Sequence, residues 1–349
     1  MFRKIRSLLC LTLALLLTLS LAGCGRSEVQ SSKSEEEVED KIKIGMCFDS
    51  FVIERWQRDR DVFVQAAKEM GAEVNVQNAN GDVEEQKKQI DYFIKKGMDV
   101  IVIVCIDSDA LSDSVKDAKN AGIKVIAYDR LINNADIDLY ISFDNEMVGT
   151  LMGQALVDNG IKGGNVIIVG GSLADNNVAL VENAFTEVMN YNGVNILDTT
   201  HCDGWRAELA SEYIYENIDL VQDCDAIMCG NDNLASEVVG ALSVQRLAKK
   251  IMVTGQDADL EACQRIVEGT QIMTVYKPVE KLAHRAAECA LALAKGEEIL
   301  GEDVGTINNG DKEVPYVKLE PIKVTKENMD ETIISSGFHM KEEVYLNVK

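Results

Sequence analysis

Short apolar runs rich in β-branched residues recur along this chain, and several of them stop at a compact polar cluster. Between them lie stretches whose apolar residues repeat every three or four positions, which is typical of amphipathic helices. Apolar runs without polar alternation indicate strands that are buried on both faces of a parallel sheet. The runs that precede polar clusters are 44–48, 125–128, 166–170, 226–229, 251–254 and 272–276.

From residue 41 onward these strands alternate with predicted helices, which indicates an α/β fold. Right-handed crossovers place such a series in a parallel sheet covered by helices on both faces. A single sheet of this size would be unusually wide, so we predict two similar Rossmann-like lobes. The predicted helices are 55–70, 83–96, 111–121, 145–159, 177–190, 206–217, 234–247, 260–268 and 278–295.

The N-terminal segment has the pattern of a targeting signal rather than of a folded element. Three basic residues precede an apolar stretch at 8–21, which is too short to be expected to span a membrane. The stretch ends in Leu-Ala-Gly-Cys at 21–24, which resembles a bacterial lipobox and implies cleavage after residue 23 with a lipid on Cys24. The alternative is an ordinary signal peptide with an incidental cysteine. We expect residues 24–40, which are acidic and nearly free of apolar residues, to form a disordered tether.

Charge and cysteine content restrict the possible functions. The formal net charge of −23 and the absence of a basic stripe argue against binding to nucleic acid or to anionic membranes. Seven cysteines remain beyond residue 24, at 47, 105, 202, 224, 229, 263 and 289, and none forms a C-x-x-C pair. We interpret most of them as small buried hydrophobic residues, with one disulfide as an alternative. We expect no metal site, since only three histidines occur and none has zinc-ligand spacing.

The motifs of common enzyme classes are absent. The sequence contains no P-loop, no G-x-G-x-x-G dinucleotide fingerprint and no G-x-S-x-G nucleophile elbow. We therefore expect no catalytic residues, no cofactor and no enzymatic activity.

The polar clusters are the informative feature, because open α/β sheets bind ligands beyond the carboxyl ends of their strands. Arginine and carboxylates can bond neighbouring hydroxyls, asparagine can donate and accept, and an indole covers the apolar face of a sugar ring. We therefore predict a site for a small polyhydroxylated ligand. Single members have simpler explanations, such as a helix N-cap at Asn177 or Asn231. The predicted site residues are Arg55, Trp56, Asp129, Arg130, Asn177, Trp205, Asn231, Asp257 and Lys277.

Residues from about 42 to 340 resemble the D-xylose-binding members of the type I periplasmic sugar-binding family, which also includes ribose- and galactose-binding proteins. The most specific matching stretches are Glu-Arg-Trp at 54–56, Gly-Gln-Asp-Ala-Asp at 255–259 and Met-Thr-Val-Tyr-Lys-Pro at 273–278. The resemblance implies that the seven polar site residues bond the sugar and that Trp56 and Trp205 sandwich its ring. Cys47 and Cys105 are not expected in this family.

The resemblance also implies two lobes joined by three hinge crossings. We expect the first lobe to comprise 42–144 with 278–303, and the second to comprise 145–277 with 304–349. The implied function is that of a substrate-binding lipoprotein of an ABC sugar importer, which binds D-xylose by hinge closure and passes it to a membrane permease. The alternative is a membrane-anchored sensor that presents the bound pentose to a kinase or chemoreceptor. We expect a monomer on the outer face of the cell membrane, held there only by its lipid.

Overall fold

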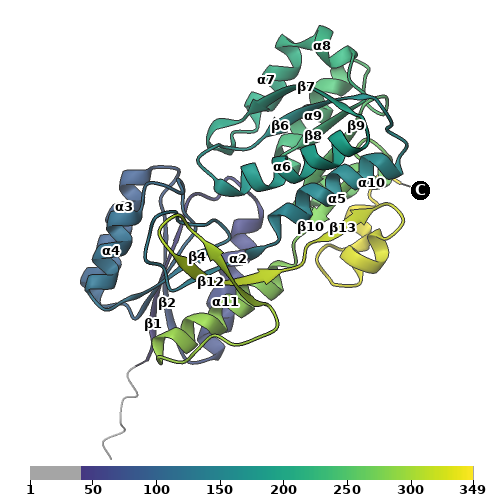
Figure 1. Ribbon diagram of the computed structural model, residues 1–349. Helices are drawn as coiled ribbons and strands as arrows, with labels where there is room; N and C mark the ends of the chain where they lie inside the picture. The colour runs from purple at the N-terminus through teal and green to yellow at the C-terminus, as the bar shows by residue number, and fades with distance from the viewer. Residues whose placement is uncertain (1–40, 349) are drawn as a thin grey trace, which may run out of the picture. The chain divides into compact units, whose positions relative to one another are not determined.

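The computed structural model describes residues 41–348 and contains two parallel sheets (Figure 1). The predicted signal peptide and tether, including Cys24, lie outside the described residues. Among the helices that are described, none combines the length and apolar character needed to cross a bilayer.

The first sheet has seven strands in the order β11-β12-β5-β4-β3-β1-β2. All of its neighbouring strands are parallel except β11 and β12. The strands are β1 (Lys43–Phe48), β2 (Glu73–Asn78), β3 (Val100–Ile103), β4 (Lys124–Tyr128), β5 (Leu139–Phe143), β11 (Val304–Asn308) and β12 (Glu313–Leu319). Helices α2 (Arg55–Glu69) and α11 (Val279–Ala294) pack on one face, and α3 (Val83–Lys96) and α4 (Ser112–Asn120) on the other.

The second sheet has six strands in the order β13-β10-β9-β8-β6-β7, and only β13 is antiparallel to its neighbour. The strands are β6 (Asn165–Gly170), β7 (Asn195–His201), β8 (Ala226–Cys229), β9 (Met252–Gln256), β10 (Met273–Tyr276) and β13 (Ile322–Thr325). Helices α5 (Asn145–Asp158) and α6 (Asn176–Tyr191) cover one face. Helices α7 (Glu208–Glu216), α8 (Ile218–Gln222) and α9 (Asp232–Val244) cover the other.

Short elements complete the second lobe. A 3₁₀ turn, η1 (Asp203–Trp205), follows β7, and α10 (Leu260–Glu268) follows β9. The C-terminal elements η2 (Asp330–Ile334) and α12 (Lys341–Val344) pack against α10 in a separate apolar cluster.

Local sequence explains why these elements begin and end where they do. Asp82, Asp144 and Asp175 precede α3, α5 and α6, and each carboxylate accepts a hydrogen bond from a backbone N–H of the first turn. Gly97 and Gly269 end α3 and α10 in the left-handed conformation. The predicted α/β class with two helix-flanked parallel sheets is confirmed.

The chain passes between the two sheets after β5, after β10 and after β12. The expected division placed 304–349 in the second lobe, and that part is wrong because β11 and β12 belong to the first sheet. β12 pairs with β5 from Tyr316 opposite Tyr140 to Leu319 opposite Phe143. The third crossing therefore lies at Glu320 and Pro321, directly before β13, and not between residues 303 and 304.

All seven cysteines of the described residues are buried and free, which confirms that they serve as small core residues. No disulfide links any two of these seven. The described residues also contain no group of three or more His, Cys, Asp or Glu side chains that could hold a metal ion.

Candidate functional site

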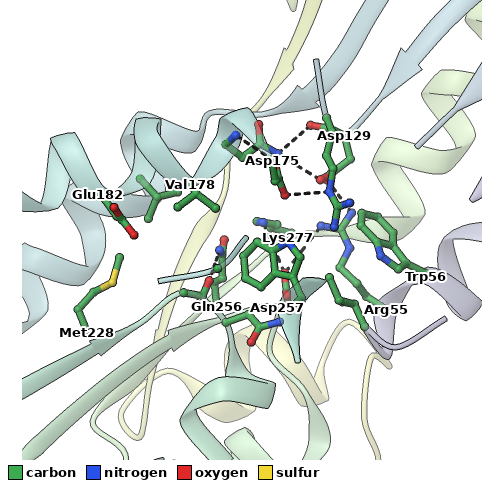
Figure 2. A pocket seen from close by; sticks show the side chains of 18 residues that line it. Arg55, Trp56, Asp129, Asp175, Val178, Glu182, Met228, Gln256, Asp257 and Lys277 are labelled. Carbon is green, nitrogen blue, oxygen red and sulfur yellow. Dashed lines mark hydrogen bonds and ion pairs between the residues drawn. The ribbon is translucent and has the colours of Figure 1, made fainter. Parts of the chain in front are cut away.

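All nine predicted site residues line one cavity (Figure 2). Each is presented just beyond the carboxyl end of a strand, either in a loop or at the start of the following helix. Both lobes contribute: Arg55, Trp56, Asp129 and Arg130 come from the first, and Asn177, Trp205, Asn231, Asp257 and Lys277 from the second.

Arg55 is the centre of the charge network on one side of the cavity. Its guanidinium forms two hydrogen bonds of 3.2 Å with Asp59, one turn further along α2. It also lies 3.0 Å from a carboxylate oxygen of Asp129 and 3.7 Å from one of Asp257, which belongs to the other lobe. Lys277 Nζ lies 3.5 Å from the same Asp257 oxygen. Arg55 therefore links the two lobes at the cavity.

Arg130 makes a second link between the lobes. Its Nη1 donates to Asp49 at 2.9 Å, within the first lobe, and to the carbonyl oxygen of Cys105 at 3.0 Å. Its Nε lies 2.8 Å from Asp175, the N-cap of α6 in the second lobe. All of these side chains are buried. Because an unpaired buried charge is costly, each arginine needs its carboxylates in place.

Asn177 and Asn231 differ in how much of the amide a ligand can use. Asn177 is not the N-cap; its Nδ2 donates across the lobes to the carbonyl oxygen of Asp129 at 3.0 Å. Asn231 does cap α9, since its Oδ1 accepts from Leu234 N at 2.9 Å. The N-cap explanation therefore holds for Asn231 Oδ1, and the NH2 group at Nδ2 is the part that can donate to a ligand.

The two indoles sit in different surroundings at the cavity. Trp56 is buried, with the guanidinium carbons of Arg55 and Arg130 4.6 and 5.7 Å from its ring centroid. The ring of Trp205 lies directly on the backbone of Gly171, where an added Cβ would be 2.2 Å from the ring. Glycine at 171 therefore allows the Trp205 ring to lie where it does. The sandwich of a sugar between the two indoles stays a prediction.

Two loop carboxylates occupy equivalent positions in the two lobes. Asp129 follows β4 and donates its N–H to Ile141 of β5, and Asp257 follows β9 and donates its N–H to Val275 of β10, both at 2.8 Å. Both residues are left-handed, with φ of 64° and 98°. This conformation is uncommon for residues with a side chain and occurs often at functional sites.

Burial and charge act in opposite directions on these carboxyl groups. Burial alone would raise the pKa of Asp129, but the neighbouring Arg55, Lys277 and Arg130 lower it below its ordinary value. Asp129 is therefore ionised at neutral pH and can accept hydrogen bonds. For Asp175, burial raises the pKa despite the opposing effect of Arg130.

Sequence reasoning missed other residues that line the cavity. Asp175 and Gln256 are polar residues that follow predicted strands but were not assigned to the site, and Gly171 and Gly230 gave no chemical signal. An apolar side with Val178 and Met228, next to Glu182, lies away from Arg55 (Figure 2). Apolar residues of this kind look like core positions in sequence, so no local pattern distinguishes them.

Several buried polar atoms of the lining residues have no hydrogen-bond partner among the residues that the structure describes. They include both indole Nε1 atoms, Arg130 Nη2, Glu182 Oε1 and Gln256 Oε1. Unsatisfied buried polar groups are rare in folded proteins, because each costs about 1–3 kcal/mol. A ligand with several hydroxyl groups offers the donors and acceptors that such atoms lack.

Comparison with known proteins identifies the family. Residues 44–298 match the family described as "Periplasmic binding protein domain". The chain belongs to the periplasmic binding protein family. It is similar to the D-xylose-binding periplasmic proteins of Haemophilus influenzae and Escherichia coli, with 46% identity to each. These alignments cover 87% of this chain and 92% and 93% of the two relatives. The resemblance found in the sequence is thereby confirmed.

Solved structures of this family agree with the fold. An ABC transporter solute-binding protein from Clostridium phytofermentans with bound β-D-glucose is 29% identical, with a TM-score of 0.79 over 86% of this chain and 99% of that one. A carbohydrate transporter solute-binding protein from Chloroflexus aurantiacus in complex with D-glucose is 27% identical, also with a TM-score of 0.79, over 86% and 97%. Both of these proteins are solute-binding components of transporters.

Proposed function

We propose that this periplasmic binding protein is the substrate-binding component of an ABC importer and that its ligand is a monosaccharide, D-xylose. The observation that carries the proposal is the cavity between the lobes, whose lining residues carry several buried polar atoms without a hydrogen-bond partner among the described residues. The two relatives named for D-xylose support the choice of sugar.

In this proposal the predicted residues divide the recognition of the sugar by chemistry. The sugar's hydroxyls donate to the carboxylates of Asp129 and Asp257 and accept from the cationic side chains and the asparagine amides. Trp56 and Trp205 cover the apolar faces of the ring. The polar members are Arg55, Asp129, Arg130, Asn177, Asn231, Asp257 and Lys277.

Binding is coupled to closure of the lobes, because the sugar's partners are divided between them. The links from Arg55 to Asp257 and from Arg130 to Asp175 join the lobes at the cavity, and backbone atoms of Ser108 and Ala174 add a 2.9 Å hydrogen bond. A sugar that contacts both lobes favours the closed state by its additional contacts there. The permease then recognises the closed form.

Titration calorimetry with D-xylose, D-ribose, D-glucose and L-arabinose tests the proposal. Trp56 and Trp205 are the only two tryptophans, so the intrinsic fluorescence reports on the cavity. We expect D-xylose to bind with the highest affinity, to change the fluorescence and to be recovered unchanged. Absence of heat and of a fluorescence change with all four sugars, or conversion of xylose to a product, would contradict the proposal.

We also propose that the protein is a monomer anchored to the outer face of the cell membrane by a lipid on Cys24. The lipobox-like sequence at 21–24 supports this. Replacing Cys24 by serine should move the protein from the membrane fraction to the soluble fraction. A Cys24→Ser variant that stays with the membrane would show that another segment holds it. The molar mass measured by light scattering tests whether the protein is a monomer.

A further inference from the structure

Asp232, beside the site residue Asn231, is fully buried and connects three strand ends of the second lobe. Its carboxylate accepts from Gln271 Nε2 at 2.8 Å, from the hydroxyl of Thr274 at 2.6 Å and from the backbone N–H of Asp259 at 3.2 Å. All three partners are donors. The carboxylate therefore holds these three groups in fixed positions relative to one another. Asp232 itself does not line the cavity.

Thr274 extends the same network to the loop after β9. Its hydroxyl donates to Asp232 Oδ2 and accepts from the backbone N–H of Ala258 at 3.2 Å. The pair therefore bonds the N–H groups of two successive residues, Ala258 and Asp259, which directly follow Asp257. Thr274 is itself fully buried in β10.

The strand next to the pair provides the space for it. A Cβ added at Gly255 would lie 2.2 Å from Asp232 Oδ1, so the carboxylate occupies the space that a side chain would fill. The loop also needs such support, because Asp257 and Ala258 are left-handed at φ 98° and 57°. This backbone conformation is disfavoured for residues with a side chain unless the surroundings hold it.

We propose that Asp232 and Thr274 are positioning residues for Asp257. They hold the loop in the conformation that brings the Asp257 carboxylate to 3.7 Å from Arg55 and 3.5 Å from Lys277 at the cavity. The inference rests on the proposed function, because Asp257 matters for affinity only if the cavity binds a sugar. Neither residue lines the cavity.

Thr274→Val tests the inference, since valine keeps the branched shape and removes both hydrogen bonds. We expect D-xylose to bind about tenfold more weakly in calorimetry, which corresponds to ~1.4 kcal/mol, and Thr274→Ser to restore the affinity. The matched control is Thr254→Val on the adjacent strand β9. Thr254 is equally buried, but its hydroxyl has no partner among the described residues. This control should leave the affinity within about twofold.

A double-mutant cycle separates positioning from a general structural effect. If Thr274 acts through Asp257, Thr274→Val should change the affinity less than about twofold once Asp257→Ala is present. The inference would be overturned if Thr274→Val lowered the affinity equally with and without Asp257→Ala. It would also be overturned if the wild-type protein bound D-xylose and Thr274→Val alone did not weaken that binding.

Hydrogen exchange gives a readout that does not depend on a sugar. The amides of Ala258 and Asp259 should exchange at least about tenfold faster in Thr274→Val and be unchanged in Thr254→Val. If the wild-type protein bound no sugar but this difference appeared, the proposed function would fail while the role of the pair in holding the loop would stand. Unchanged exchange at both amides would refute that role.

Discussion

Replacing Gly171 by alanine should weaken sugar binding by moving Trp205, without touching any polar group of the site. The added Cβ would lie 2.2, 2.3 and 2.5 Å from three ring carbons of Trp205. Carbon atoms in contact are separated by about 3.5–4.0 Å, so the ring must retreat by about 1 Å or more. Trp205 is only 8% exposed and has little free space apart from the cavity it lines.

The expected cost follows from that displacement. Forcing an extra methyl group into a packed position costs about 1–3 kcal/mol of folding stability. If the ring moves into the cavity, it also occupies volume that the sugar needs. We therefore expect the affinity for D-xylose to fall at least about tenfold, or ~1.4 kcal/mol. Titration calorimetry measures this loss, and urea denaturation measures the stability.

Gly240→Ala is the matched control. Gly240 lies in α9, and an added Cβ would meet nothing within 4 Å. Alanine there should leave the affinity unchanged and stabilise the helix by about 0.5–1 kcal/mol. If Gly171→Ala bound D-xylose as tightly as this control, the placement of the Trp205 ring as part of the sugar site would be refuted.

Three further changes test other parts of the site. Lys277→Ala should weaken D-xylose binding about ten- to a hundredfold, as expected for a lost charged hydrogen bond of about 1.5–3 kcal/mol; unchanged calorimetric affinity would remove Lys277 from the site. Arg55→Ala should lower the free energy of unfolding by about 3–5 kcal/mol, because three buried carboxylates lose a partner, and a loss below about 1 kcal/mol in urea denaturation would contradict this. Burial raises the pKa of Asp232 to about 7. The neighbouring carboxylates of Asp257 and Asp259 act in the same direction, and Arg265 opposes them. Between an unfolded pKa of about 3.9 and that value the folded state binds more protons, so the free energy of unfolding falls as pH rises. The free energy of unfolding of Asp232→Asn minus that of wild type should therefore increase from about pH 4 to about pH 7 and then level off. A difference that does not change with pH would argue against a raised pKa of Asp232.

Much of the fold was predictable because its central strands are continuous apolar runs. The bounds of β1, β4, β6 and β8 agree to within one residue with the apolar runs at 44–48, 125–128, 166–170 and 226–229, since a strand buried on both faces leaves a sharp apolar signal. The hairpin of β11 and β12 was harder to predict. Residues 304–308 are half-buried or exposed at the edge of the sheet, so their sequence carries no clear alternation.

The third crossing was misplaced for the same reason. Without β11, the chain after α11 gave no sign that it still belonged to the first sheet. Two of the three prolines, Pro278 and Pro321, lie at crossings between the lobes. The third proline, Pro315, lies within β12, so proline positions alone could not have located the crossing.

The site was predictable where side-chain chemistry follows a strand. Asp129 and Asp257 were found because a charged residue directly after a buried strand is conspicuous. Gly171 was not, because its contribution is the absence of a side chain beneath Trp205, and only the packed structure shows that contact. Asp232 was not assigned a role from the sequence, because its partners lie 27 to 42 residues away.

The seven buried thiols allow the local opening of each lobe to be measured by chemical labelling. An aromatic disulfide reagent reaches a thiol only when the surrounding structure opens, so the rate of modification measures local opening. Peptide mapping after brief exposure would report the first lobe through Cys47, Cys105 and Cys289, and the second through Cys202, Cys224, Cys229 and Cys263. Because no disulfide joins these seven cysteines, the rate of thiol modification can be followed without added reductant and without introducing a cysteine by mutation.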